Sequence, residues 1–156
     1  MESRFENFTV LINRISRNIR KIKNGEMAEY NLRSAHISCL YYLNSSEGLT
    51  ATELCEKCEE DKATVSRALD YLETEGYITC RSKHIKKYKS PINLTEEGRK
   101  IAGKISEKID SVLEEVSAEL TEEERAAFYR SLFIISDSLD KVARRLAKND
   151  GTSRIK

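Results

Sequence analysis

The sequence is poor in residues that break regular structure, and it has no long apolar run. It holds one proline and six glycines among 156 residues, which disfavours a proline- and glycine-rich all-β fold. No run of about 18 apolar residues occurs, so the sequence predicts no transmembrane helix and no membrane partner. The segment Met1–Phe5 has no basic region followed by an apolar one, and we therefore expect no signal peptide and a cytoplasmic protein.

A bias toward one sign of charge is also missing. There are 27 Lys and Arg residues against 26 Asp and Glu, so the net charge of +1 says nothing about a polyanionic partner. Hydrophobic residues make up 39% of the chain and charged residues 34%, a balance that favours long charged helices and argues against global disorder. At this length we expect one compact domain, or a small domain with helical extensions.

Catalytic motifs are absent as well. The sequence has no Gly-rich phosphate loop, nucleophile elbow or metalloprotease motif. We therefore expect neither an enzyme nor a cofactor. Four cysteines occur, and the spacing Cys55-x-x-Cys58 is found in metal and redox sites. A structural zinc site needs about four ligands and no second pair has matching spacing, so we expect no metal and thiols that pack in the core.

Both ends of the chain carry apolar stripes at helical spacing. Apolar residues recur in steps of three and four from Phe5 to Ile22 and again from Phe128 to Leu146. A small central unit cannot cover two such stripes, so we expect a homodimer in which the terminal helices pack against a second copy. The expected interface residues are Phe5, Phe8, Ile12, Ile15, Phe128, Leu132, Ile135, Leu139 and Val142.

The middle of the chain predicts two short helices joined by a tight turn. Thr50 and Glu53 have the spacing of a capping box, and Asp61 is a good N-cap for a second helix that Gly76 ends. The apolar positions of the second helix face the core, which leaves a polar face for the major groove of DNA. Arg67 is our candidate for base readout, because a bidentate contact with guanine contributes roughly 1–3 kcal/mol of discrimination. The residues of this face are Lys62, Thr64, Ser66 and Arg67.

A basic β-hairpin is predicted next. Segments 77–80 and 91–94 are rich in strand formers, although Pro91 suits an edge strand. Residues 81–90 carry a net charge of +5, whereas ten acidic against four basic side chains give residues 96–124 a net charge of −6. The neutral total therefore hides a polarised molecule with a basic part that faces DNA. The hairpin residues expected at DNA are Arg81, Lys83, Lys86, Lys87 and Lys89.

The predicted fold is mainly α with a small β-hairpin wing, a winged helix-turn-helix with long terminal dimerisation helices. Residues 1–31 form the N-terminal dimerisation helix and 32–95 the DNA-binding domain. Residues 96–150 form the C-terminal dimerisation helices, and 151–156 a flexible tail.

The run Leu54–Ile78 and the element Leu94-Thr95-Glu96-Glu97-Gly98 resemble the MarR family of bacterial and archaeal transcriptional regulators. The flanking helices extend the resemblance over nearly the whole chain. It implies a homodimer that binds a pseudo-palindromic operator, usually as a repressor, and that a small phenolic or other anionic effector releases. It also implies that Thr50 and Thr52 contact phosphates. By the same resemblance, the segment from Lys62 to Arg67, which includes Ala63, would lie in the major groove, and the wing would reach a minor groove.

One departure from the family concerns the wing. Members commonly carry Asp-x-Arg eight residues before the Leu of the Leu-Thr element, where this chain has Lys86-Lys87-Tyr88. The acid and the arginine that it braces are both absent, so Lys86 or Lys87 would supply the minor-groove cation without that brace. The family's peroxide sensors use a cysteine in the first helix, and this chain has none there.

Three residues are candidates for effector binding, each with a simpler alternative. Arg14 belongs to a basic helix face that solvent alone would explain. His36 begins the helix that borders the effector pocket in the family, but it is equally a surface or interface histidine. Tyr41 suits an aromatic ligand or ordinary packing. Two alternatives to the whole interpretation stay open, namely a winged-helix module that docks a protein and a regulator of the same type that responds to thiol oxidation or to a metal.

Overall fold

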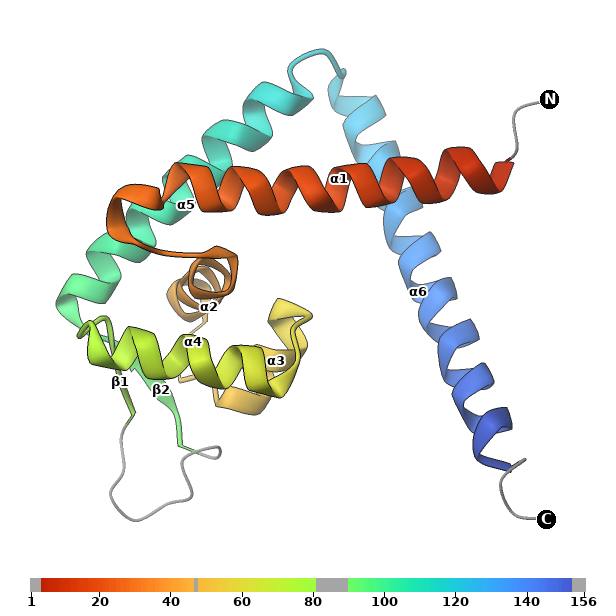
Figure 1. Cartoon of the computed structure of the whole chain (residues 1–156). Coiled ribbons are helices and arrows are strands. Elements are labelled where there is room, and N and C mark those ends of the chain that lie inside the picture. Colours follow the sequence, from red (N-terminus) through yellow and green to blue (C-terminus); the bar gives the residue numbers. More distant parts are fainter. Residues whose placement is uncertain (1–3, 47, 81–89, 153–156) are drawn as a thin grey trace. The chain divides into compact units, whose positions relative to one another are not determined.

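The chain folds into helices and a two-stranded sheet (Figure 1), as expected for a mainly α winged fold. The computed structural model describes residues 4–46, 48–80 and 90–152. Within these ranges the two-stranded sheet is the only sheet. The chain divides into two compact units, Met1–Asp110 and Ser111–Lys156. None of the helices in the described ranges is both long and apolar enough to cross a membrane.

The first unit starts with α1 (Arg4–Glu26), the 3-10 helix η1 (Ala28–Tyr30) and α2 (Ser34–Ser45). The α1 helix ends one residue after Asn24-Gly25. The side-chain carbonyl of Asn24 accepts a hydrogen bond of 2.8 Å from the backbone N–H of Ser34. This bond connects the end of α1 to the start of α2.

The central elements follow in the order of a winged helix-turn-helix. They are α3 (Ala51–Cys58), α4 (Lys62–Thr74), β1 (Ile78–Cys80) and β2 (Ile92–Leu94). The strands pair antiparallel, with Ile78 opposite Leu94 and Cys80 opposite Ile92. The backbone N–H of Ile92 also donates to the carbonyl of Leu49 at 2.9 Å, which connects the hairpin to the segment before α3.

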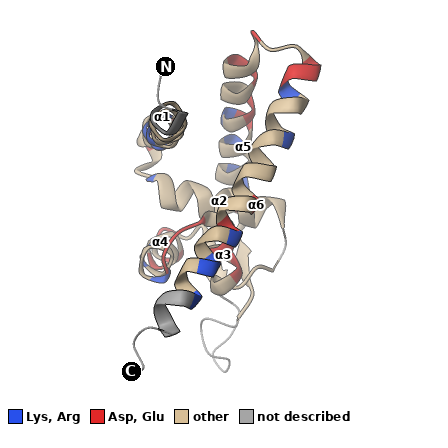
Figure 2. Ribbon diagram, turned by 90° about the vertical axis from the view of Figure 1, so that its right-hand side faces the viewer, with Lys and Arg blue, Asp and Glu red and all other residues tan. Residues whose placement is uncertain are grey.

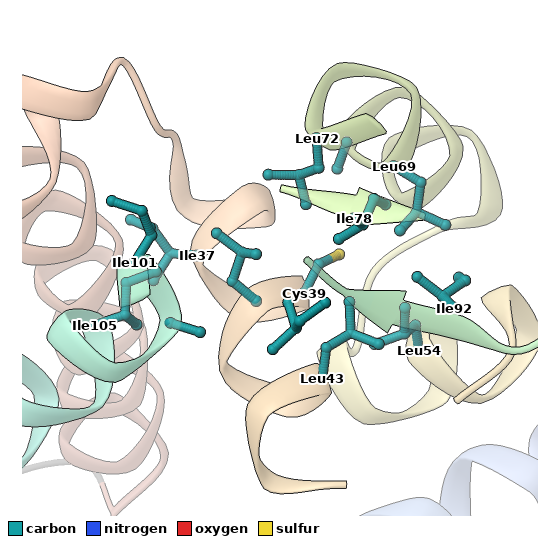
Figure 3. Packing of buried hydrophobic residues seen from close by; sticks show 14 of the residues in the cluster. Ile37, Cys39, Leu43, Leu54, Leu69, Leu72, Ile78, Ile92, Ile101 and Ile105 are labelled. Carbon is teal, nitrogen blue, oxygen red and sulfur yellow. The ribbon is translucent and has the colours of Figure 1, made fainter. Parts of the chain in front are cut away.

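One apolar core holds the first unit together (Figure 3). It combines the inner faces of α2, α3 and α4 with the hairpin and the first half of α5 (Glu96–Ser117). Its members come from distant parts of the sequence, so burying them fixes how α4 sits on the unit. Figure 3 labels Ile37, Cys39, Leu43, Leu54, Leu69, Leu72, Ile78, Ile92, Ile101 and Ile105.

The Leu94–Gly98 element fastens the end of α4 to the start of α5. The Thr95 hydroxyl donates to the carbonyl of Gly76 at 2.7 Å and accepts from the N–H of Gly98 at 3.0 Å. A Cβ atom on Gly98 would lie 1.9 Å from the carbonyl oxygen of Tyr77, so this position needs glycine. The φ angle of +76° at Gly76 likewise favours glycine, as expected for the residue that ends α4, the helix predicted to enter the major groove and called the recognition helix below.

The second unit contains the end of α5 and the helix α6 (Glu122–Thr152). A capping box begins α6. The Glu124 carboxylate accepts from the backbone N–H of Thr121 at 2.8 Å, and the Glu124 N–H donates to the Thr121 hydroxyl at 3.2 Å. The α6 helix extends through Thr152. It therefore includes the first two residues of the segment 151–156 that was expected to be a tail.

Candidate nucleic-acid interface

The expected capping box at the start of α3 is formed. The N–H of Glu53 donates to the Thr50 hydroxyl at 3.3 Å, and the Glu53 carboxylate accepts from the backbone N–H of Thr50 at 2.8 Å. These bonds hold the pKa of Glu53 below its usual value. The Thr50 hydroxyl itself donates to Glu53 at 2.7 Å, so its proton is already used. Thr52 is exposed and is the better placed of the two expected phosphate contacts.

The turn between α3 and α4 is short and has a left-handed residue. Glu59 follows the last residue of α3 with φ +54°. Asp61 then caps α4, because its carboxylate accepts from the N–H of Thr64 at 2.9 Å and from the Thr64 hydroxyl at 2.7 Å. The hydroxyl bond and the N–H bond lower the pKa of Asp61. The N-cap predicted at Asp61 is thus present.

The α4 helix buries one face and exposes the other. Its buried side chains are Val65, Ala68, Leu69 and Leu72, the positions that were expected to face the core. Thr64 is half-buried. The exposed positions in the first half of α4 are Lys62, Ala63, Ser66 and Arg67. This arrangement presents a short methyl, a hydroxyl and two cations, groups that match base edges and phosphates in a major groove.

Arg67 is held in place by a chain of polar contacts that starts at the cap. Its Nη2 donates to the Thr64 hydroxyl oxygen at 3.3 Å, and that hydroxyl donates to Asp61. The guanidinium therefore has a preferred direction while most of its donors remain available. The sequence marked Asp61 as a cap and Arg67 as a reader, but it did not reveal that Thr64 connects them.

The wing is described only at its strands. The expected DNA contacts Arg81, Lys83, Lys86, Lys87 and Lys89 lie outside the described residues, as do the nearby His84 and Tyr88.

Figure 2 shows acidic residues gathered at the connection between α5 and α6. Four basic residues of α6, Lys141, Arg144, Arg145 and Lys148, line a common hollow.

The three effector candidates have different neighbours. Arg14 is exposed on α1. The ring of Tyr41 meets that of Tyr42 edge-on at a centroid distance of 5.4 Å. His36 stacks on Tyr71 of α4 with centroids 4.4 Å apart, and its Nδ1 accepts from the N–H of Arg33 at 3.1 Å. Burial and the nearby Arg33 lower the pKa of His36, so the ring is neutral near pH 7, and because Nδ1 accepts a hydrogen bond the ring proton sits on Nε2.

Apolar side chains are exposed along both terminal helices. On α1 they include Phe8, Ile12 and Ile15, and on α6 they include Phe128 and Leu139, all named as interface residues from the sequence. Ile135 and Val142 are also exposed, Leu132 is half-buried, and the side chain of Phe5 lies outside the described set. Among the residues whose side chains the structure describes, Phe133 is the most exposed large apolar residue, at 74%. The sequence analysis missed it because it lies off the regular stripe.

The three thiols that the structure describes lie in or against the core, as the sequence predicted. Cys39 of α2 is fully buried, whereas Cys55 and Cys58 of α3 are half-buried and pack against the core. Among the described residues no group of three or more His, Cys, Asp or Glu side chains is arranged to hold a metal ion.

Comparisons with known proteins agree on the type of protein. A sequence model of the MarR family matches residues 30–84. The chain is 30% identical over 117 residues to the uncharacterized HTH-type transcriptional regulator YwoH of Bacillus subtilis (strain 168), a match that covers 75% of this chain and 85% of that protein.

Solved structures show the same fold. A MarR family transcriptional regulator from Silicibacter pomeroyi is 26% identical, with a TM-score of 0.70 over 80% of this chain and 84% of that one. The S. aureus MepR protein, solved as a complex with DNA, is 21% identical, with a TM-score of 0.75 over 84% of this chain and 97% of that one.

Proposed function

The chain belongs to the MarR family of transcriptional regulators, and from this premise we propose that it is a homodimeric repressor that binds a pseudo-palindromic operator and leaves it when a small effector binds. That it is a DNA-binding regulator and not an enzyme follows from the family. Repression, dimerisation, operator and effector are the parts that we add. We assign DNA binding to residues 32–95 and dimerisation to 1–31 and 96–150.

The exposed first half of α4 carries the proposal. Its buried face fixes the helix on the core. Asp61 caps the helix, and the first turn that follows carries no acidic side chain. We assign base readout to Arg67 and Ser66, and phosphate contacts to Lys62 and Thr52. The basic segment 81–89 supplies the second contact, on the strength of its sequence alone.

Dimerisation is supported by the apolar faces of the terminal helices. Single exposed apolar residues are ordinary on a protein surface, but contiguous apolar stripes mark an interaction site. A second copy of the chain supplies complementary stripes, and a two-fold dimer presents two copies of α4 to the two halves of a palindrome.

Effector release is supported by the neutral His36 at the start of α2. Its Nε2–H is a donor for a phenol oxygen or a carboxylate, and its stack on Tyr71 connects that position to the recognition helix. Arg14 and Tyr41 remain proposed members of the effector site. A ligand that binds one spacing of the recognition helices better than another would shift the population away from the DNA-bound state.

The first experiment measures binding to the DNA upstream of the protein's own gene by fluorescence anisotropy, against scrambled DNA and at two salt concentrations. We expect preference for the upstream DNA and an affinity that falls steeply as salt rises. Arg67→Ala should remove the preference, while Arg99→Ala, an exposed arginine on α5, should leave it unchanged. Absence of binding at low salt would contradict the proposal and favour the protein-docking alternative.

A further inference from the structure

A hollow on α6 is lined by four basic side chains, and it lies within the second unit. Its volume is about 360 Å³, which falls in the range of small-ligand sites, about 300–1,000 Å³. The four side chains are exposed, and Figure 2 shows basic residues gathered toward the C-terminal end of α6. The residues that line this basic hollow are Lys141, Arg144, Arg145 and Lys148.

The spacing of these residues puts them on one face of the helix, because positions three and four apart are neighbours on a helix surface. Lys141 therefore lies beside Arg145, and Arg144 beside Lys148, in pairs of like charge that destabilise a helix. Asp137 pairs with Lys141 at 2.6 Å. Arg144 and Arg145 form no ion pair with any residue that the structure describes, so their donors are available to a ligand from solvent.

The dipole of α6 does not account for this cluster of charge. A helix dipole stabilises cations near the C-terminus, but its effect falls off within the last turn. The α6 helix continues through Thr152, and its last turn contains no basic residue. A solvent-exposed helix face also tends to alternate the sign of its charges, whereas residues 141–148 carry four cations and no acid. An anionic ligand would relieve the repulsion among these cations.

We propose that the basic hollow binds a small ligand that carries two or more linked phosphate groups. An arginine fork matches two phosphate oxygens at once and a lysine ammonium acts as a point charge, so the hollow offers both kinds of phosphate contact. At a rise of about 1.5 Å per residue, its cations extend over about 10 Å of the helix axis. One phosphate group contacts only part of that length, whereas linked phosphates reach both ends and gain affinity from being tethered.

The phosphate chain is the part of the ligand that the hollow recognises. The residues that line it provide no aromatic ring on which a base could stack. The chain is therefore bound alike whether it is free or belongs to a nucleoside triphosphate. ATP and inorganic tripolyphosphate should bind with equal affinity, and a clear preference for ATP would contradict this assignment. Because the site is exposed, salt should weaken binding of both.

Isothermal titration calorimetry of the full-length protein in a phosphate-free buffer tests the site, with inorganic tripolyphosphate as the probe. We expect one site per chain and an affinity about tenfold or more above that for orthophosphate. Arg144→Gln should weaken tripolyphosphate binding about tenfold, since it removes hydrogen bonds to a charged group. Arg144→Lys keeps the charge but not the fork, and it should lose less affinity.

Arg130→Gln is the matched control, because Arg130 is an exposed arginine of the same helix that does not line the hollow. It should bind tripolyphosphate as the wild type does. A loss equal to that of Arg144→Gln would show that net charge alone is responsible and would overturn the site. Orthophosphate that binds as tightly as tripolyphosphate, or tripolyphosphate that does not bind at low salt, would also overturn it. Circular dichroism of each variant checks that it is folded.

DNA is the other source of phosphate groups, and measuring its binding separates this inference from the proposed function. Arg144→Gln should leave the affinity for the upstream DNA and its salt dependence unchanged. If this variant instead lowers the salt slope by about one and tripolyphosphate does not bind, the cations contact the DNA backbone and the inference is wrong. If the wild type binds tripolyphosphate but no DNA, the proposed function fails and the basic hollow stands.

Discussion

The imidazole of His36 lies flat on the ring of Tyr71, with centroids 4.4 Å apart and ring planes 7° from parallel. The Tyr71 hydroxyl donates to the carbonyl of Asn31 at 3.3 Å. One side chain of the recognition helix thus contacts both the start of α2 and the connection before it. These two contacts connect α4 to the segment from Asn31 to the start of α2.

We predict that acid destabilises the protein through His36. Burial lowers the pKa of His36 in the folded state below the value of about 6.5 for an unfolded chain, so the unfolded state binds more protons. Stability from this site is complete above that pH and is lost as the pH falls below it. Thermal unfolding at about pH 7.5 and about pH 5.5 should show a smaller loss of melting temperature in His36→Gln than in the wild type. An equal loss in both proteins would remove His36 as the cause.

We predict that Gly98→Ala is severely destabilising. The new Cβ would lie 1.9 Å from the Tyr77 carbonyl oxygen, which is backbone and cannot move aside cheaply. We expect a loss of roughly 1–3 kcal/mol or more in urea unfolding. Gly103→Ala is the matched control, because its Cβ would meet nothing within 4 Å on the same helix, and it should gain about 0.5–1 kcal/mol from helix propensity. A stable Gly98→Ala protein would show that α5 can shift away from the hairpin.

The parts of the site that follow from local rules were predictable from the sequence. The capping pairs at Thr50 and Asp61 involve residues three apart, and the buried face of α4 follows from helical spacing. The stack between His36 and Tyr71 joins different helices. Only the packed core brings those residues together, so no spacing rule could have found them.

We predict that Asp61→Ala weakens operator binding more than its effect on stability explains. Removing the carboxylate leaves the N–H of Thr64 uncapped and frees the Thr64 hydroxyl that positions Arg67. The melting temperature should fall, and operator affinity should fall further than in a surface variant of equal stability. Asp61→Asn keeps a cap acceptor and should retain most binding. The lowered pKa of Asp61 means that the cap is present above about pH 4 and is lost as the pH falls through the folded-state value.

We predict that a single charge on the apolar face of α6 turns the dimer into a monomer. Leu139 is 53% exposed in the isolated chain, and burying it against a second copy would remove apolar surface from water. Leu139→Glu places a carboxylate in that interface, where an unpaired charge is costly to bury. Light scattering after size-exclusion chromatography should show half the wild-type mass. Operator affinity should drop because a monomer carries a single α4 and engages only one of the two half-sites.

Ser138→Glu is the control for this substitution, because it adds the same charge to an exposed polar position one residue away on α6. It should remain dimeric and bind the operator normally. A monomeric wild-type protein would contradict the proposed dimer directly. The exposed apolar stripes would then have to pack against something other than a second copy of the chain. If the Leu139→Glu protein stays dimeric, the interface lies on α1 and does not include this face of α6. In that case Ile15→Glu on α1 should be the variant that separates the two copies.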